Sequence, residues 1–294
     1  MHILLTGATG FLGSALLHQF IKDGYRISIV KRSASSLNRI KDVLNYVEVM
    51  DCGLVSFRDI FSKSDFDAVI NTACCYGRNG ESAVEILEGN LMFGVQLLQC
   101  CAERNTPFIN TGSLLNPLVN EYALSKNQLE QWMGHFSGCC KSVTVKLDHI
   151  YGPGDDAQKF VGMLLTNFVK GTPEINLTKG DQTRDFIHIN DVVDVFSRVL
   201  EKLTELKNRT VLVVGSRREI SIKDFVLLVR NIWRDETGRE CISKLNFGVL
   251  PYREHEIMRT IIEPVSIAGE PWEAKIVIED GLKEYVRWFL NKGS

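Results

Sequence analysis

The chain has 294 residues, enough for one large domain or two of moderate size. Hydrophobic residues make up 45% of it and charged residues 24%, which argues against a disordered, collagen-like or coiled-coil chain. The 34 Lys and Arg residues nearly balance 36 Asp and Glu residues, so the net charge of −2 indicates neither a nucleic-acid partner nor an anionic membrane surface.

Targeting and metal-binding signals are absent from the sequence. No run of about 18 apolar residues predicts a transmembrane segment. The start, MHILLTGATG, lacks the basic residues of a signal peptide and reaches glycine early. The eight cysteines include three adjacent pairs but no C-x-x-C, and the six histidines are scattered, so we expect no metal site. We therefore expect a cytoplasmic protein with reduced, mostly buried cysteines.

Short apolar runs alternate with amphipathic stretches through the first 150 residues. Strands are predicted at 2–6, 26–30, 46–50, 67–72, 107–111 and 142–149. Helices are predicted between them at 11–23, 82–104 and 119–136. This repeated strand–helix–strand order predicts an α/β fold with a Rossmann-type, doubly wound parallel sheet.

The pattern changes after YGPGDD (151–156), and no Ser/Gly-rich linker separates the two halves. The later predicted elements are strands at 174–178 and 211–215 and helices at 157–170, 190–203, 221–233 and 279–291. We predict a nucleotide-binding Rossmann domain over 1–155, rejoined by about 186–204, and a smaller mixed α/β domain over 156–294.

A glycine-rich turn, TGATGFLG, follows the first predicted strand and opens an apolar helix. Such a turn permits close backbone approach to a pyrophosphate, which the amide groups and dipole of the helix N-terminus then stabilise. The strand before it and the helix after it support a dinucleotide site over a mere turn. The residues assigned to this contact are Gly7, Thr9, Gly10, Phe11, Leu12 and Gly13.

The end of the second strand bears on the choice between NAD(H) and NADP(H). NAD sites place Asp or Glu there for the ribose 2′-hydroxyl, but this chain has Lys31, Arg32 and Ser33, so no carboxylate is available. A guanidinium fork suits a 2′-phosphate, which favours NADP(H). The alternative is a solvated basic pair on a surface loop.

Polar residues also follow two other predicted strands. Asp51 and Cys52 come after the third, where a carboxylate or neighbouring amides can meet the adenine. Asn71, Thr72 and Ala73 close the fourth and are expected to line the cofactor's phosphate and ribose. Both assignments rest on position, because ligands of such sheets bind at the carboxyl ends of strands.

Tyr122 and Lys126 are four residues apart on a predicted helix and so share one face. The ammonium is expected to lower the pKa of Tyr122 and to reach the nicotinamide ribose. Ser113, just past the fifth strand, can donate a hydrogen bond to a carbonyl oxygen beside Tyr122. The three together predict carbonyl reduction; the alternative is a surface Tyr/Lys pair. Asn90 can hold a water beside the lysine, or be an ordinary helix cap.

The segments TGATGFLG, NTAC, HIYGPGD (149–155) and RDFIHINDVV (184–193), with the Tyr/Lys pair, occur in order over essentially the whole chain. The sequence thereby resembles the extended short-chain dehydrogenase/reductase family, also called the NAD-dependent epimerase/dehydratase family. The resemblance implies a nucleotide sugar in the smaller domain and a homodimer joined through helices 82–104 and 119–136. It also implies that Arg184 and Arg253 bind the diphosphate; a surface salt bridge is the alternative for each.

NTACCYGRNGES, FINTGSLL and FGVLPYREHEIM carry a narrower resemblance. It is to those family members that reduce the 4-keto group of a CDP-linked 3,6-dideoxyhexose for bacterial surface polysaccharide. It implies NADPH-dependent reduction, with a CDP-sugar as the preferred partner and with His149 where the family carries asparagine. The implied substrate-binding residues are Tyr76, Gly77, Ser113, His149, Lys159, Arg184 and Arg253.

Two other functions stay open. A nucleotide-sugar 4-epimerase uses the same tyrosine and lysine but returns the hydride and keeps NAD bound, whereas a reductase releases its cofactor; the cations at 31 and 32 favour the reductase. A non-catalytic NADP(H)-binding sensor or scaffold usually lacks the tyrosine or the lysine, and this chain has both. A 4,6-dehydratase is disfavoured because no Asp-Glu pair follows Ser113.

Overall fold

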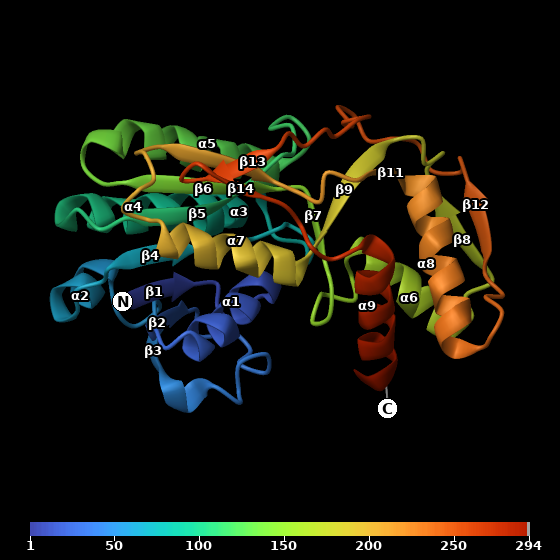
Figure 1. Ribbon diagram of the computed structural model, residues 1–294, viewed down its shortest axis with the longest axis horizontal. Coiled ribbons are helices and arrows are strands. Elements are labelled where there is room, and N and C mark those ends of the chain that lie inside the picture. The colour runs from blue at the N-terminus through green and yellow to red at the C-terminus, as the bar shows by residue number, and fades with distance from the viewer. Residues whose placement is uncertain (293–294) are drawn as a thin grey trace. The chain divides into compact units, whose positions relative to one another are not determined.

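The computed structural model describes residues 1–292, and its larger sheet consists of seven parallel strands (Figure 1). These are β1 (His2–Thr6), β2 (Arg26–Lys31), β3 (Val47–Asp51), β4 (Ala68–Asn71), β5 (Phe108–Ser113), β6 (Ser142–Leu147) and β10 (Thr210–Val214). The order β10-β6-β5-β4-β1-β2-β3 reverses between β1 and β4, the point at which doubly wound sheets bind ligands. The predicted Rossmann-type fold is confirmed.

Helices alternate with these strands along the chain. They are α1 (Phe11–Lys22), α2 (Phe57–Lys63), α3 (Ala83–Leu87), α4 (Phe93–Arg104), α5 (Glu121–His135) and α7 (Ile189–Glu201). A single π-helical turn, η2 (Glu88–Met92), joins α3 to α4. The central strands are mostly buried because helices cover parallel sheets on both faces, and Ile3, Leu4 and Leu5 of β1 are fully buried.

The chain divides into two compact units, described here separately. Unit 1 comprises Met1–Leu147, Val193–Val214 and Val265–Trp272, and unit 2 comprises Asp148–Val192, Gly215–Pro264 and the chain from Glu273. The predicted strand at 211–215, placed in the second domain from the sequence, is β10 and pairs with β6 at the edge of the unit 1 sheet. The strand pattern itself does not specify which distant segment a strand joins. Residues 293 and 294 of the predicted second domain lie outside the described residues.

Unit 1 also contains the hairpin of β13 (Val265–Ile267) and β14 (Glu270–Trp272), and unit 2 has short strands of its own. In unit 2, β7 (His149–Tyr151), β9 (Thr183–His188) and β11 (Glu219–Ser221) form one sheet, and β8 (Glu174–Leu177) pairs with β12 (Lys244–Phe247). The predicted strand 142–149 is thus divided: β6 ends at Leu147, and β7 begins a second sheet at His149.

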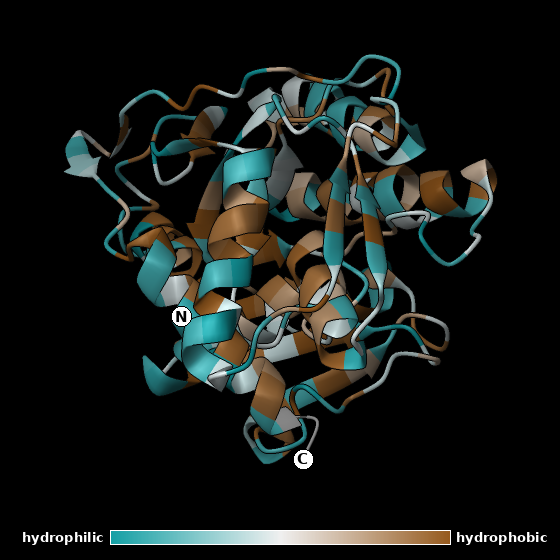
Figure 2. Ribbon diagram, turned by 90° about the vertical axis from the view of Figure 1, so that its right-hand side faces the viewer, coloured by the Kyte–Doolittle hydropathy of each residue, from teal (hydrophilic) through white to brown (hydrophobic). Residues whose placement is uncertain are grey.

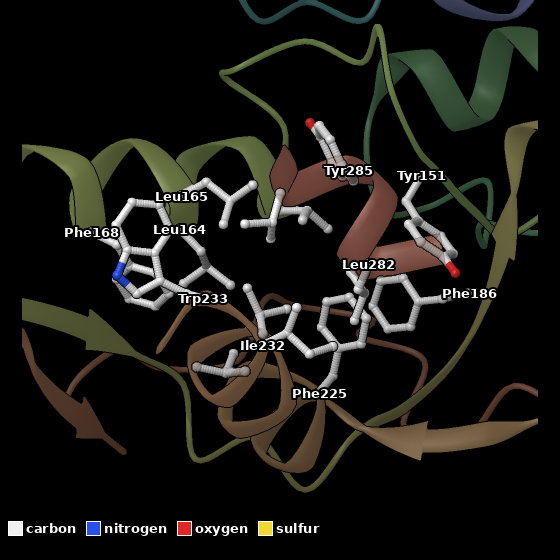
Figure 3. Packing of buried hydrophobic residues seen from close by; sticks show 14 of the residues in the cluster. Tyr151, Leu164, Leu165, Phe168, Phe186, Phe225, Ile232, Trp233, Leu282 and Tyr285 are labelled. Carbon is white, nitrogen blue, oxygen red and sulfur yellow. The ribbon is translucent and has the colours of Figure 1, made fainter. Parts of the chain in front are cut away.

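Three helices build the core of unit 2: α6 (Phe160–Lys170), α8 (Ile222–Thr237) and α9 (Ile278–Lys292). Hydrophobic and hydrophilic stretches alternate along the helices in Figure 2, as expected of helices with one buried face. Figure 3 shows the buried side chains that meet between them, where the rings of Phe186 and Phe225 stack with centroids 3.6 Å apart. Within residues 1–292, no helix is both long and apolar enough to cross a membrane.

Candidate active site

The turn after β1 requires glycine for steric reasons. Gly7 has a φ of 73°, and a Cβ atom there would lie 2.6 Å from the amide nitrogen of Ala73. A Cβ atom on Gly13 would lie only 2.1 Å from the carbonyl oxygen of Gly7. Helix α1 begins next to this turn with Gly10 as its N-cap, and no side chain caps it. A close backbone turn leading into an uncapped helix N-terminus fits a pyrophosphate.

The ends of β2 and β3 correct one sequence interpretation. Asp51 Oδ2 lies 3.0 Å from Lys31 Nζ, so a carboxylate is present beside the cations, contrary to expectation. Asp51 Oδ1 accepts hydrogen bonds from Ser33 Oγ and from the Gly53 amide, both at 2.9 Å. The Gly53 amide, with Lys31 and Ser33, lowers the pKa of Asp51. The sequence interpretation considered only the residues that follow β2, whereas Asp51 belongs to the neighbouring strand.

Arg32 and Cys52, at the same ends of β2 and β3, differ in whether they already form polar contacts within the protein. Arg32 is exposed, and its guanidinium pairs with no carboxylate in residues 1–292. The Cys52 amide, predicted to face the adenine, donates to the Lys31 carbonyl oxygen at 3.0 Å. Of the two predicted cations, only Arg32 is therefore uncommitted.

The polar side chains at the end of β4 form hydrogen bonds with other residues of the protein. Asn71 is buried; its Oδ1 accepts a hydrogen bond from Thr6 Oγ1 at 2.7 Å, and its Nδ2 donates to Asn110 Oδ1 at 3.0 Å. Thr72 Oγ1 donates to the Thr6 carbonyl oxygen at 2.8 Å. Asn71 and Thr72 thus join the ends of β1 and β4 to the middle of β5, rather than presenting free side chains to a ligand.

The predicted proton-transfer residues come from β5 and α5. Asn120 caps α5 by accepting a hydrogen bond from the Ala123 amide at 2.8 Å, which fixes where Tyr122 and Lys126 lie. Ser113 is the last residue of β5, and its hydroxyl lowers the pKa of the Tyr122 phenol. Lys126 is 2% exposed, and its ammonium hydrogen-bonds to no other residue of the described chain. A buried cation without a partner is suited to hydroxyl groups of a bound ligand.

Burial changes the pKa values of both groups on α5. It raises the pKa of Tyr122, an effect that nearby Cys74 reinforces and the Ser113 hydroxyl opposes. It lowers the pKa of Lys126. The expected lowering of the Tyr122 pKa by Lys126 is therefore wrong for the protein alone, because loss of water around the phenol dominates. The phenol is protonated at neutral pH, which is the form a proton donor requires.

Asn90 lies in the π-helical turn η2 and is 2% exposed. Its Oδ1 accepts a hydrogen bond from the Cys75 amide at 2.6 Å, and its Nδ2 donates to the Cys75 carbonyl oxygen at 2.9 Å and to Ser125 Oγ at 3.0 Å. The helix-cap alternative is wrong, because Ser82 caps the preceding helix α3. Asn90 instead joins the loop after β4 to α5, and π-helical turns are frequent at functional sites.

The loop after β4 places a second phenol against Tyr122. The ring centroids of Tyr76 and Tyr122 are 4.8 Å apart. Arg78 Cζ lies 5.0 Å from the centroid of the Tyr76 ring, and nearby Cys74 raises the pKa of Tyr76. Gly77 has a φ of 70°, which favours glycine in this loop. Cys74 and Arg78 were not singled out from the sequence, where only their nearness to Tyr76 could have drawn attention to them.

Unit 2 carries the other residues predicted to bind substrate. Arg184 is 5% exposed; it forms an ion pair with Glu256 and donates to the carbonyl oxygens of Thr183 and Ile257, each at 2.6 Å. Nη1 and Nη2 of its guanidinium are thus engaged by two carbonyl oxygens and by Glu256 within unit 2. Arg253 is exposed and pairs with no carboxylate in the described part of the chain.

His149 and Lys159 both contact acidic residues in unit 2. His149 Nδ1 lies 2.8 Å from Asp148 Oδ1, and Lys159 Nζ lies 2.7 Å from Asp155 Oδ1. No three His, Cys, Asp or Glu side chains among residues 1–292 are grouped so as to hold a metal ion.

Comparison with known proteins gives consistent matches. The sequence model of the NAD dependent epimerase/dehydratase family matches residues 3–215. The CDP-abequose synthase of Salmonella muenchen is 28% identical over 293 residues, which cover 96% of each chain.

Solved structures share the fold over the whole length. The UDP-glucose 4-epimerase of Thermotoga maritima is 20% identical, with a TM-score of 0.83 over 100% of both chains. The UDP-glucuronic acid 4-epimerase of Bacillus cereus is 19% identical, with a TM-score of 0.83 over 99% of this chain and 100% of that one.

Proposed function

Because the chain belongs to the NAD dependent epimerase/dehydratase family, we propose that it is an NADPH-dependent 4-ketoreductase of nucleotide sugars. Its substrate would be a 4-keto-6-deoxy or 4-keto-3,6-dideoxy hexose. The observation that carries the proposal is the half-buried, protonated Tyr122 phenol, whose pKa the Ser113 hydroxyl influences and which lies one helical turn from Lys126, a buried lysine with no hydrogen-bond partner among residues 1–292. Likeness to CDP-abequose synthase supports CDP as the nucleotide.

The residues that would hold the cofactor lie at the carboxyl edge of the unit 1 sheet. The turn from Gly7 to Gly13 would receive the pyrophosphate, Arg32 the 2′-phosphate, and Lys126 the nicotinamide ribose. When bound, NADPH supplies the hydride for the sugar C4 atom.

The side chains of β5 and α5 account for the proton. Ser113 and Tyr122 donate hydrogen bonds to the substrate carbonyl oxygen, and Tyr122 gives up its proton as negative charge develops there. Because this charge is greatest in the transition state, the two donors stabilise it more than the ground state. The Lys126 ammonium then stabilises the phenolate that remains. Tyr122 can act as the acid because burial raises its pKa and keeps the phenol protonated. Lys126 can stabilise the phenolate because it lies one helical turn away.

The residues proposed to bind the substrate include two arginines. We propose that Arg253 binds the diphosphate and that Arg184 joins it by exchanging the Glu256 carboxylate for phosphate oxygens. His149, Lys159 and Gly77 are proposed to contact the substrate, and the Tyr76 ring to cover the apolar sugar C6 methyl group.

A cytoplasmic homodimer is also proposed. Exposed apolar side chains on the helical segments 82–104 and 119–136 support a subunit contact there. They include Val84, Met92, Leu124 and Trp132.

Cofactor preference gives the first prediction. Arg32→Ala should weaken NADPH binding by roughly 1.5–3 kcal/mol, the contribution of a charge-assisted hydrogen bond, and should leave NADH binding nearly unchanged. Titration of each variant with both cofactors measures this effect. Equal affinity of the native protein for NADPH and NADH would contradict the proposed preference.

The proposal is tested by incubating the protein with NADPH and CDP-4-keto-3,6-dideoxyglucose. A reductase consumes NADPH in proportion to the alcohol formed. A 4-epimerase interconverts two 4-hydroxy sugars with no net consumption, and a sensor or scaffold binds NADPH without turnover. Only the first outcome supports the proposal.

A further inference from the structure

The ends of β2 and β3 hold a carboxylate that is fully hydrogen-bonded within the protein. Lys31 and Asp51 are direct neighbours in the register of the two strands, with Nζ and Oδ2 3.0 Å apart. Only 16% and 17% of their side chains are exposed. The other oxygen, Oδ1, accepts two hydrogen bonds, from Ser33 Oγ and the Gly53 amide. Asp51 therefore stays ionised while both of its oxygens are occupied.

Arg32 lies next to this pair and differs from Lys31 in being free. Its side chain is exposed and has no ion-pair partner among residues 1–292. The three charged groups, Lys31, Asp51 and Arg32, sum to +1. Since Lys31 and Asp51 cancel each other at contact distance, the charge left for a ligand is that of Arg32.

We infer that Lys31 determines cofactor choice by neutralising Asp51, and not by binding the 2′-phosphate itself. A free carboxylate at this edge would repel a 2′-phosphate and would accept hydrogen bonds from the ribose hydroxyls of NAD(H). Paired with Lys31, Asp51 does neither, and Arg32 is left to bind the 2′-phosphate. The inference rests on the proposed NADP(H) site, because it concerns the same sheet edge.

Three variants separate this role from direct phosphate binding. Lys31→Met frees Asp51, Asp51→Asn removes the negative charge, and the double variant restores the native net charge without either group. Dissociation constants for NADP⁺ and NAD⁺ are measured for each by isothermal titration calorimetry, so that no turnover is needed. Lys31→Arg is the matched control, because it keeps the ion pair.

The expected pattern is a loss followed by rescue. Lys31→Met should lower the preference for NADP⁺ over NAD⁺ by roughly 10-fold or more, as expected when one charged interaction is changed. The double variant should return to within about twofold of the native preference. Lys31→Arg should match the native protein. A structural defect alone would weaken both cofactors together and would leave their ratio unchanged.

The opposite pattern would overturn the inference. If Lys31 binds the 2′-phosphate directly, the double variant stays as weak for NADP⁺ as Lys31→Met, because the ligand is still missing. The double variant carries no unpaired buried charge, so it decides the question even if Lys31→Met does not fold. Native protein without a preference for NADP⁺ would instead contradict the proposed cofactor, which is a separate result.

Discussion

Replacing Tyr122 with phenylalanine should lower turnover by ~10²–10⁴, the usual contribution of a positioned general acid. The phenol is the only group of the variant that changes, and its ring still packs against Tyr76. Ser113 keeps its hydroxyl, so the substrate carbonyl oxygen loses one of two donors and its proton source. Binding of NADPH should stay nearly intact, because Tyr122 is one of many residues predicted to contact the cofactor and its ring is kept. Steady-state rates and NADPH titration measure the two effects separately.

Tyr76→Phe is the matched control for this prediction. It removes a phenol hydroxyl from the adjacent ring, which contacts Tyr122 with a centroid distance of 4.8 Å, and leaves the proposed acid in place. We expect a much smaller loss of turnover than in Tyr122→Phe. Near-native turnover of Tyr122→Phe would show that the proton comes from another group, and His149 would be the next residue to replace.

Lys126→Met should make the ligand-free protein more stable and the enzyme nearly inactive. The side chain of native Lys126 is 2% exposed, and its ammonium has no hydrogen-bond partner among residues 1–292, so methionine removes the cost of taking this charge out of water. The variant should therefore unfold at higher denaturant concentration. It should bind NADPH more weakly and lose roughly 10²-fold or more in turnover, because the ribose contact and the support for the phenolate are both absent.

Lys146→Met is a control for which we expect the opposite change in stability. Lys146 Nζ lies 2.7 Å from Glu130 Oε2, so its removal leaves a carboxylate unpaired and should lower stability without changing NADPH binding. A fall in stability of Lys126→Met, comparable to that of Lys146→Met, would contradict the interpretation of Lys126 as an unpartnered cation.

The stability gain of Lys126→Met should also depend on pH. Burial lowers the pKa of Lys126 below its ordinary value of 10.5, so the unfolded chain binds more protons than the folded one between the two pKa values. The free energy of unfolding of the native protein therefore rises with pH through that window. The advantage of Lys126→Met should shrink as pH rises, and denaturant unfolding at several pH values measures it.

The strands of the Rossmann-type sheet were predictable because their signals are local. Strand β1 contains the continuous apolar run of Ile3, Leu4 and Leu5, and the turn at Gly7 follows closely in the sequence. The place of β10 was not predictable, since its partner β6 lies far away in the chain. The strand β9 was known only as the motif RDFIHI, whose polar residues hide the strand pattern.

All eight cysteines are unpaired, and four of them are buried.

The candidate site was predictable to the level of residue types, but not of their contacts. Motif spacing indicated Ser113, Tyr122 and Lys126. It did not indicate that Lys31 pairs with Asp51 across two strands, or that Arg184 is engaged by Glu256 from a distant segment. Such pairs depend on tertiary contacts between groups of opposite charge. The raised pKa of Tyr122 has the same origin, because burial is a property of the folded chain.

Hydride delivery to the sugar C4 atom is the central claim, and isotope transfer tests it most directly. The protein is supplied with CDP-4-keto-3,6-dideoxyglucose and with NADPH that carries deuterium stereospecifically at C4 of the nicotinamide. We predict deuterium at C4 of the product sugar, with one NADP⁺ formed for each molecule of product. Interconversion of two 4-hydroxy sugars without net loss of NADPH, or a product with no deuterium at C4, would contradict it.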